Sequence, residues 1–199
     1  MRARSIRRTH NRTVRSAFTL AELMIVVAIS GMMIALAIPR IDTTKYKADA
    51  IAQIIRTTLQ NASRTAVTRQ HDMIVSFDTV GERIRQHWDA NNDGLVTTGE
   101  RVIYRGLDNG ILFTDPAVNG VSGTAIHSPI TGSAVAVVGG MPTITFHRDG
   151  SVSSDAEIYV SIAARGPKWY RALVLTQATG RVDWYRLNTS TNKWVIAGL

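Results

Sequence analysis

A predominantly apolar run occupies residues 18–39, and Glu22 is its only charged residue. About 20 residues of α-helix cross the hydrocarbon core of a bilayer, so the run predicts one transmembrane helix. A carboxylate at the centre of such a helix costs about 2.5–3.5 kcal/mol on insertion scales. It is therefore retained for a function, unless it lies close enough to the helix end to snorkel to the surface. The run predicts a membrane anchor with a functional acid near its start.

Residues 1–17, ahead of this run, contain six arginines and no acidic residue. Basic flanks stay on the cytoplasmic side of a membrane, so the N-terminus is expected in the cytoplasm and the rest of the chain across the membrane. The leader also supplies most of the net charge of +8, because the remaining chain has 17 Lys and Arg against 15 Asp and Glu. The positive net charge therefore indicates the orientation of the chain in the membrane and not nucleic-acid binding. A secretory signal cut after Ala37 is the alternative.

The residues around the start of the run, Ala17-Phe18-Thr-Leu-Ala-Glu22-Leu, resemble the class III signal of type IV prepilins and type II secretion pseudopilins. The resemblance implies that a prepilin peptidase cuts between Ala17 and Phe18 and methylates the new amine of Phe18. It also implies that the helix is retained in the bacterial inner membrane, and that Glu22 pairs with the N-terminal amine of a neighbouring subunit. Ala17 departs from the Gly that the family usually has before the cut.

The pattern changes after Pro39, where apolar residues begin to recur at steps of three and four. This spacing places them on one face of an α-helix. Residues 40–70 are therefore predicted as the amphipathic half of the same long helix, kinked near Pro39 and packed on a domain. The predicted buried stripe consists of Ala48, Ile51, Ile55, Leu59, Ala62 and Ala66.

Residues 71–199 predict an antiparallel β domain, because short segments of partly alternating apolar residues are separated by Gly and Asn turns. Residues 115–141, rich in Gly, Ser and Pro, predict a long loop in which 134–138 is the one candidate strand. The fold class is α+β, a long N-terminal helix packed on an antiparallel sheet. The predicted strands are 73–77, 83–88, 102–104, 111–113, 143–146, 157–162, 171–175 and 182–185.

Three further stretches are similar to the GspH/FimT family of minor pseudopilins and minor pilins. They are an Asp/Asn/Gly-rich loop ending in Glu100-x-Val-Ile, then Ile144-Thr-Phe-x-x-x-Gly, then Arg171-x-Leu-x-Leu-x-x-x-Thr-Gly-Arg-Val. The similarity implies a pilin-like fold and a non-enzymatic structural role in the tip or priming complex of a type II secretion pseudopilus or type IV pilus. The partners it implies are other pilins or pseudopilins, the prepilin peptidase and the inner membrane.

Residues 89–100 match the spacing of a twelve-residue calcium loop, with Gly94 at the sixth place. The flanks are predicted strands and not the paired helices of an EF-hand. The alternative is a hairpin loop whose Asx side chains cap its own backbone, and no cofactor is then required. The candidate calcium ligands are Asp89, Asn91, Asp93, Leu95, Thr97 and Glu100.

A basic C-terminal segment is the candidate for DNA binding, with Arg181 and Arg186 as the candidate residues. Some minor pilins of the resembled family bind DNA through Gly-Arg-x-Arg, where this chain has Gly180-Arg181-Val-Asp183. Asp183 stands in place of the second arginine of this pattern, which counts against DNA binding. Aromatic residues interleave with the cations, as in single-strand binders. The ordinary interpretation, which the sequence favours, is core aromatics and solvated cations.

Catalysis has little support in the sequence. The chain has no cysteine, which excludes disulfides and thiol nucleophiles. His71, His87, His127 and His147 show no metal-ligand spacing, and no Gly-x-Ser-x-Gly or phosphate-loop motif is present. A signal-anchored periplasmic domain with another activity is the enzyme alternative, but the residues favour a chain that is not an enzyme.

Overall fold

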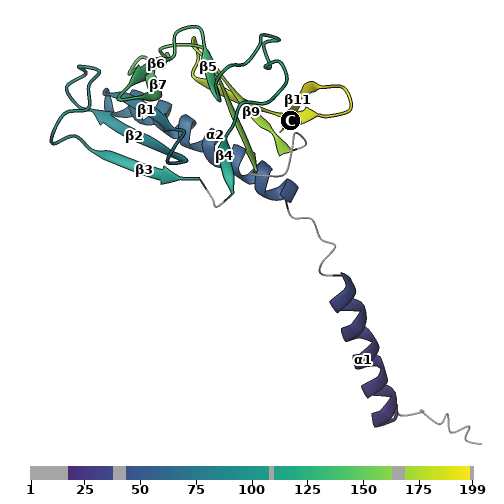
Figure 1. Ribbon diagram of the computed structural model, residues 1–199. Coiled ribbons are helices and arrows are strands. Elements are labelled where there is room, and N and C mark those ends of the chain that lie inside the picture. Colours follow the sequence, from purple (N-terminus) through teal and green to yellow (C-terminus); the bar gives the residue numbers. More distant parts are fainter. Residues whose placement is uncertain (1–17, 38–43, 108–109, 163–168, 198–199) are drawn as a thin grey trace, which may run out of the picture. The chain divides into compact units, whose positions relative to one another are not determined.

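The computed structural model describes residues 18–37, 44–107, 110–162 and 169–197, and it divides the chain into two units, Met1–Asp42 and Thr43–Leu199. The described part of the first unit contains the helix α1 (Leu20–Ala37). The second unit contains the helix α2 (Thr44–Arg69) and the strands β1 to β11 (Figure 1). The predicted continuity of one helix through Pro39 lies outside the described residues.

The amphipathic helix α2 confirms the predicted stripe, because all six of its predicted residues are at most 2% exposed. Its last turn is closed by Gln70, which has a φ of 58°. This is the left-handed conformation that commonly ends a helix, adopted here by a residue other than Gly. The Gln70 side chain donates a hydrogen bond of 2.7 Å to the carbonyl of Val67, one of the carbonyls that the helix end leaves unpaired.

The first sheet has the order β3-β2-β1-β7-β6, and all its neighbouring strands are antiparallel. The predicted first hairpin is confirmed, with Asp78 opposite Arg83 across the turn. Asp78 Oδ1 accepts the N–H of Gly81 at 2.7 Å, which stabilises this turn. The strands are β1 (Asp72–Asp78), β2 (Arg83–Asp89), β3 (Val102–Gly106), β6 (Ala136–Val138) and β7 (Met141–Phe146).

The second sheet has the order β11-β10-β9-β8-β4, and β5 also pairs with β8. Its strands are β4 (Ile111–Phe113), β5 (Ile130–Gly132), β8 (Ala156–Ile162), β9 (Arg171–Thr176), β10 (Arg181–Asn188) and β11 (Lys193–Ala197). Three features differ from the prediction. The consecutive strands β3 and β4 belong to different sheets, the long loop contains β5 as well as β6, and β11 was not predicted.

Helix α2 packs against both sheets, contacting β1 and β7 of the first and β8, β9 and β10 of the second. One apolar cluster fills the space between them. It joins Ile55 and Leu59 of α2 to Val75 of β1 and Leu173 of β9, all of which are fully buried. The domain is therefore α+β, with its core on the faces of the two sheets that meet α2.

Candidate functional site

A capping box formed by Thr19 and Glu22 closes the N-terminal end of α1. The Thr19 hydroxyl oxygen accepts the N–H of Glu22 at 3.2 Å, and Glu22 Oε2 accepts the N–H of Thr19 at 3.1 Å. The same hydroxyl donates to Glu22 Oε2 at 3.2 Å. Each side chain thereby satisfies an N–H group that the helix start leaves without a carbonyl. The Thr-x-x-Glu spacing is the sequence signal for this cap, a role of Glu22 that the family resemblance does not predict.

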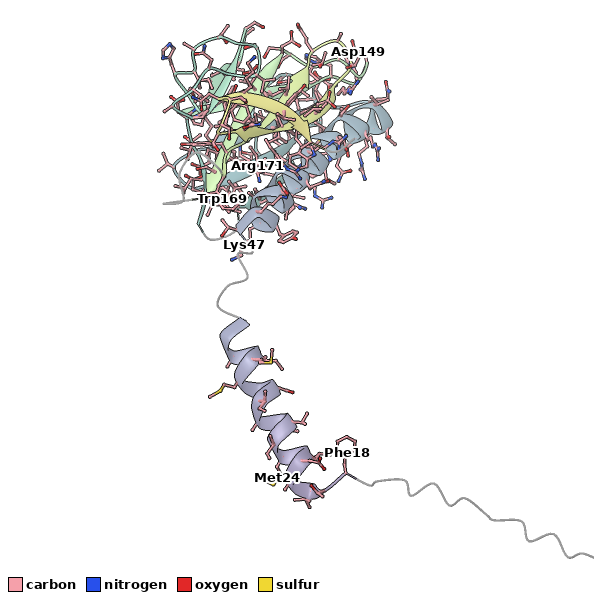
Figure 2. The ribbon with its side chains drawn as sticks, turned by 90° about the vertical axis from the view of Figure 1, so that its right-hand side faces the viewer. Phe18, Met24, Lys47, Asp149, Trp169 and Arg171 are labelled. Atoms are coloured by element: carbon pink, nitrogen blue, oxygen red, sulfur yellow. The ribbon has the colours of Figure 1, made fainter. Side chains whose placement is uncertain are left out.

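The predicted processing and assembly residues lie beside this cap. Phe18 is 80% exposed and directly precedes Thr19, whereas Ala17 lies outside the described residues. The described side chains of α1, from residue 20 to 35, are all exposed, and they project in several directions around the helix (Figure 2). Within residues 18–37, 44–107, 110–162 and 169–197, no helix is both long enough and apolar enough to cross a membrane.

The predicted calcium ligands in the loop 89–100 largely bind the loop's own backbone. Asp89 Oδ1 accepts the N–H of Asp93 at 3.0 Å, and Asp89 Oδ2 accepts the N–H of Gly94 at 2.7 Å. Asp93 Oδ1 accepts the N–H of Leu95 at 2.8 Å, while its other oxygen accepts the Asn91 amide at 2.8 Å. These are the side-chain-to-backbone bonds of an Asx-rich turn.

Glu100 closes the same loop through both of its carboxylate oxygens. Oε1 accepts the N–H of Ala90 at 2.9 Å, and Oε2 accepts the N–H of Thr97 at 3.0 Å. Oε2 also lies 2.7 Å from Nε2 of His87, whose side chain is fully buried in β2. The Thr97 N–H bond, with the Thr97 side chain, His87 and Ala90, lowers the pKa of Glu100 to about 2. Glu100 is thus held as an anion that pins the two ends of the loop together.

The same hydrogen bonds decide whether the oxygens of this loop are available to bind calcium. Over the described ranges, no three His, Asp or Glu side chains form a group that could hold a metal ion. Calcium would need six or more oxygens, and Asp89 and Glu100 would have to give up N–H partners to supply them. The geometry is that of the self-capped loop, and calcium binding stays a prediction.

The two candidate DNA-binding arginines lie on opposite faces of β10. Arg181 pairs with Asp183 two residues along the strand, with Nε 2.9 Å from Oδ2. Arg186 lies an odd number of residues further on, so its side chain points to the other face, toward α2. There it donates to both carboxylate oxygens of Asp49, at 3.1 and 2.9 Å, and stacks 5.0 Å from the ring centre of Trp184. The two arginines therefore do not form one basic site, and each already has an acidic partner.

Asp49 of α2 forms ion pairs with two arginines, an arrangement that the sequence does not predict. It accepts Nε of Arg171 at 2.8 Å in addition to the bonds from Arg186. Arg171 is 2% exposed, and this burial lowers the pKa of its guanidinium. Since Asp49 is separated from these arginines by more than a hundred residues of chain, no local spacing could have identified the cluster.

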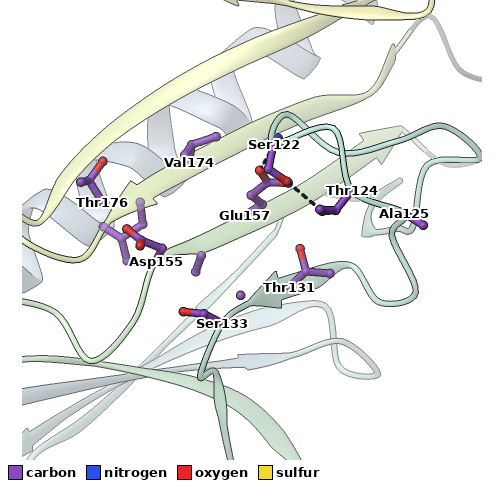
Figure 3. Close-up of a pocket in the computed structure, with 12 residues that line it drawn as sticks. Ser122, Thr124, Ala125, Thr131, Ser133, Asp155, Glu157, Val174 and Thr176 are labelled. Carbon is purple, nitrogen blue, oxygen red and sulfur yellow. Dashed lines mark hydrogen bonds between the residues drawn. The ribbon is translucent and has the colours of Figure 1, made fainter.

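A cavity of about 590 Å³ lies on the outer face of the second sheet, opposite to α2 (Figure 3). Glu157 of β8 lines it, and its Oε1 accepts the N–H of Ser122 at 2.7 Å. The hydroxyl of Tyr159 donates to the other oxygen of Glu157, and burial raises the pKa of this tyrosine. The Tyr159 hydroxyl oxygen also accepts the N–H of Val121 at 3.3 Å, so the bonds from Val121 and Ser122 fasten the segment after β4 to the sheet. The sequence predicts only a long loop here.

One histidine forms a pair with a carboxylate that resembles part of a catalytic arrangement. His147 Nδ1 lies 2.8 Å from Asp72 Oδ2, and both Ser151 and Ser153 line the same shallow depression as His147. However, Ser151 donates its hydroxyl to Asp149 at 2.6 Å, and the hydroxyl oxygen of Ser153 accepts the N–H of Thr145. Both hydroxyls thus have other partners, so the geometry does not favour a serine nucleophile.

Comparison with protein-family models and with curated proteins gave no match. Among solved structures, the chain is similar to the minor pseudopilin EpsH of the type 2 secretion system of Vibrio cholerae, at 10% identity and a TM-score of 0.45 over 76% of this chain and 97% of that one. A second structure of EpsH gives 12% identity and a TM-score of 0.45 over 77% and 95% of the two chains.

The chain is also similar to the type IV minor pilin FimU of Pseudomonas aeruginosa, at 14% identity and a TM-score of 0.46 over 77% of this chain and 96% of that one. Since these TM-scores lie below 0.5, what the chain does is inferred from its own residues.

Proposed function

We propose that this chain is a minor pilin-like structural subunit that is cut between Ala17 and Phe18 and assembles through α1. The observation that carries the proposal is the prepilin-like signal at the head of a helix that belongs to a separate unit and has only exposed side chains over residues 20–35. An apolar helix of this kind can bury its surface only in lipid or against other helices. In the sequence, the apolar run extends beyond α1 to Pro39.

In this proposal the helix spans the bacterial inner membrane once, with the leader in the cytoplasm and the β domain in the periplasm. Glu22 pairs with the N-terminal amine that cleavage creates on Phe18 of a neighbouring subunit. A carboxylate in hydrocarbon is stabilised when a cation neutralises it, so the pair favours ordered assembly. The role is structural and not catalytic, in the tip or priming complex of a type II secretion pseudopilus or type IV pilus.

The first test is the intact mass and N-terminal sequence of the protein recovered from membranes of a host that has a prepilin peptidase. We expect a chain that begins at methylated Phe18. A chain that begins after Ala37, or one that keeps its arginine-rich leader, would contradict the proposal and indicate an ordinary secreted or anchored domain.

A second test separates the charge of Glu22 from its capping role. Gln at this place of a capping box still accepts and donates hydrogen bonds, so Glu22→Gln should leave the helix start intact while removing the negative charge. We expect the variant to be cleaved normally but to be lost from filaments recovered with the partner subunits. Ser30→Ala, a change in the same helix without loss of charge, serves as the control. Normal incorporation of Glu22→Gln would rule out the assembly role of the carboxylate.

A further inference from the structure

We propose that the capping box of Thr19 and Glu22 also keeps the cleavage site outside the helix, so that Thr19 is a positioning residue for processing. The inference rests on the proposed function, because it concerns the bond between Ala17 and Phe18. It differs from the assembly role of Glu22, since it acts on the precursor before any neighbouring subunit is present.

The helix start is set by the hydrogen bonds of the cap. Helix α1 begins at Leu20, and its first main-chain bond runs from the N–H of Leu23 to the carbonyl of Thr19 at 3.2 Å. In a longer helix, the N–H of Glu22 would be donated to the carbonyl of Phe18. Here the Thr19 hydroxyl accepts it instead, at 3.2 Å. Phe18 and Thr19 accordingly lie outside the helix.

The position of this boundary decides whether the scissile carbonyl is accessible. Cleavage adds one water across the peptide bond, placing a hydroxyl on the carbonyl carbon of Ala17 and a proton on the nitrogen of Phe18. If the helix extended through this point, the N–H of Ala21 would occupy the oxygen of the Ala17 carbonyl. Proteolysis concentrates in exposed, non-helical segments, where that oxygen can be polarised by the peptidase.

The membrane setting makes the cap more important. Unsatisfied N–H groups near hydrocarbon cost several kcal/mol each, so a helix that starts there tends to gain another turn and satisfy them. Ala17 is the best helix-forming residue type and favours such an extension. The capping box weakens this drive, because it supplies partners in place for two of these N–H groups, those of Thr19 and Glu22.

The test compares two substitutions at Thr19 in the full precursor. Thr19→Val keeps the shape of the side chain but removes the hydroxyl, whereas Thr19→Ser keeps the hydroxyl. We expect cleavage of Thr19→Val in peptidase-containing membranes, followed by pulse–chase, to be about fivefold slower, the change that corresponds to about 1 kcal/mol of capping energy. Thr19→Ser should be cleaved at the wild-type rate. Equal rates for Thr19→Val and wild type would overturn the inference.

A second pair of variants shows whether helix extension is the cause. Gly at position 17 disfavours helix by about 1 kcal/mol relative to Ala. Ala17→Gly should therefore accelerate cleavage much more in the Thr19→Val background than in the wild-type background, where the cap already ends the helix. The same acceleration in both backgrounds would show that Gly acts on the peptidase directly and would overturn the inference. If the wild-type precursor is not cleaved at all, the proposed function fails; if only the Thr19 comparison fails, the proposed function stands.

Discussion

Several single carboxylates in this domain are held by backbone N–H groups and not by cations alone. The N–H of Gly81, with Arg83, lowers the pKa of Asp78, and Ser151 lowers the pKa of Asp149. Glu100 is the strongest case, with a pKa of about 2. Each of these acids stabilises its turn more strongly when it is ionised.

The low pKa of Glu100 predicts a loss of stability in acid. Its pKa falls from 4.5 in the unfolded chain to about 2 in the folded one, so its contribution is fully present above about 4.5 and disappears as the pH falls toward about 2. We expect the free energy of unfolding, measured with urea, to decrease across this window. Glu100→Gln should be less stable than wild type at neutral pH and should lose less stability in acid. An unchanged slope in Glu100→Gln would contradict the assignment.

Gly120 is predicted to be intolerant of a side chain. A Cβ at this position would overlap the carboxylate of Glu157 and lie 2.6 Å from the hydroxyl oxygen of Tyr159. We expect Gly120→Ala to destabilise the domain by about 1–3 kcal/mol, since these atoms are fixed by mutual hydrogen bonds. The control is Gly106→Ala, where a Cβ meets nothing within 4 Å. Equal melting temperatures of the two variants would refute the prediction.

Among the elements, α2 and the second sheet are joined by charge as well as by apolar packing. The carboxylate of Asp49 is the shared partner of Arg171, whose side chain is 3% exposed, and of Arg186, which is 43% exposed. Arg56 of α2 adds a hydrogen bond of 3.0 Å to the carbonyl of Val182 in β10. These contacts fix the first half of α2 on the sheet.

Removing the charge of Asp49 should be costly, because it leaves the buried guanidinium of Arg171 with less compensation. Breaking one partner of a buried ion pair typically costs about 3–5 kcal/mol, and because Asp49 is partly exposed we expect Asp49→Asn to cost somewhat less, about 2–3 kcal/mol. Urea unfolding measures this directly. The control is Asp183→Asn, whose partner Arg181 is 66% exposed and should matter by less than about 1 kcal/mol. A loss for Asp49→Asn no larger than for the control would contradict the buried-pair argument.

Calcium binding by the loop between β2 and β3 is still a prediction from the sequence, and it can be tested. A ligand that binds only the folded loop raises the melting temperature by mass action. Calcium binding therefore predicts a lower melting temperature in chelator than in calcium, and Asp93→Asn should reduce the difference. The same melting temperature in both conditions would end the calcium prediction and leave the loop closed by its own hydrogen bonds.

Local patterns predicted the elements better than they predicted their assembly. The stripe of α2 and the first hairpin follow from spacing and turn residues within a few positions, and both are confirmed. The split into two sheets could not be predicted in this way, because β3 and β4 are neighbours in sequence but pair with β2 and β8. Strand β11 was missed because Lys193-Trp-Val-Ile-Ala shows little alternation, and its place follows only from pairing with β10.

At the scale of the whole molecule, the parts of the candidate site that lie close in sequence could be predicted, and the parts that only the fold brings together could not. The cap of Thr19 and Glu22 could be predicted from a four-residue pattern, as could the self-capped loop that the sequence offered beside calcium. The cluster of Asp49 with Arg171 and Arg186 could not, because the fold alone brings these residues together. This cluster changes the interpretation of the basic C-terminal segment, since Arg186 is already paired with Asp49 of α2.

The alternative function of DNA binding can be tested on the whole protein. The alternative predicts weak, salt-sensitive binding that Arg181→Ala abolishes. From the carboxylate partners of Arg181 and Arg186 we expect no measurable binding to single- or double-stranded DNA, even at low salt, by fluorescence anisotropy. Binding that disappears in Arg181→Ala but persists in Arg148→Ala, an exposed control, would restore the alternative.

The placement of α2 against both sheets has a mechanical consequence. Tension that reaches the domain through residue 44 acts along a helix of 26 residues whose buried stripe contacts both sheets. To yield, the helix must slide out of the core over its whole length, so its contacts bear the load together. A pull on the opposite terminus would instead peel the edge strand β11 from β10, one pair of residues after another. The domain should therefore resist force from its N-terminal side better than force from its C-terminal side. Under the proposed function, in which the subunit is anchored by α1, the load enters from the N-terminal side.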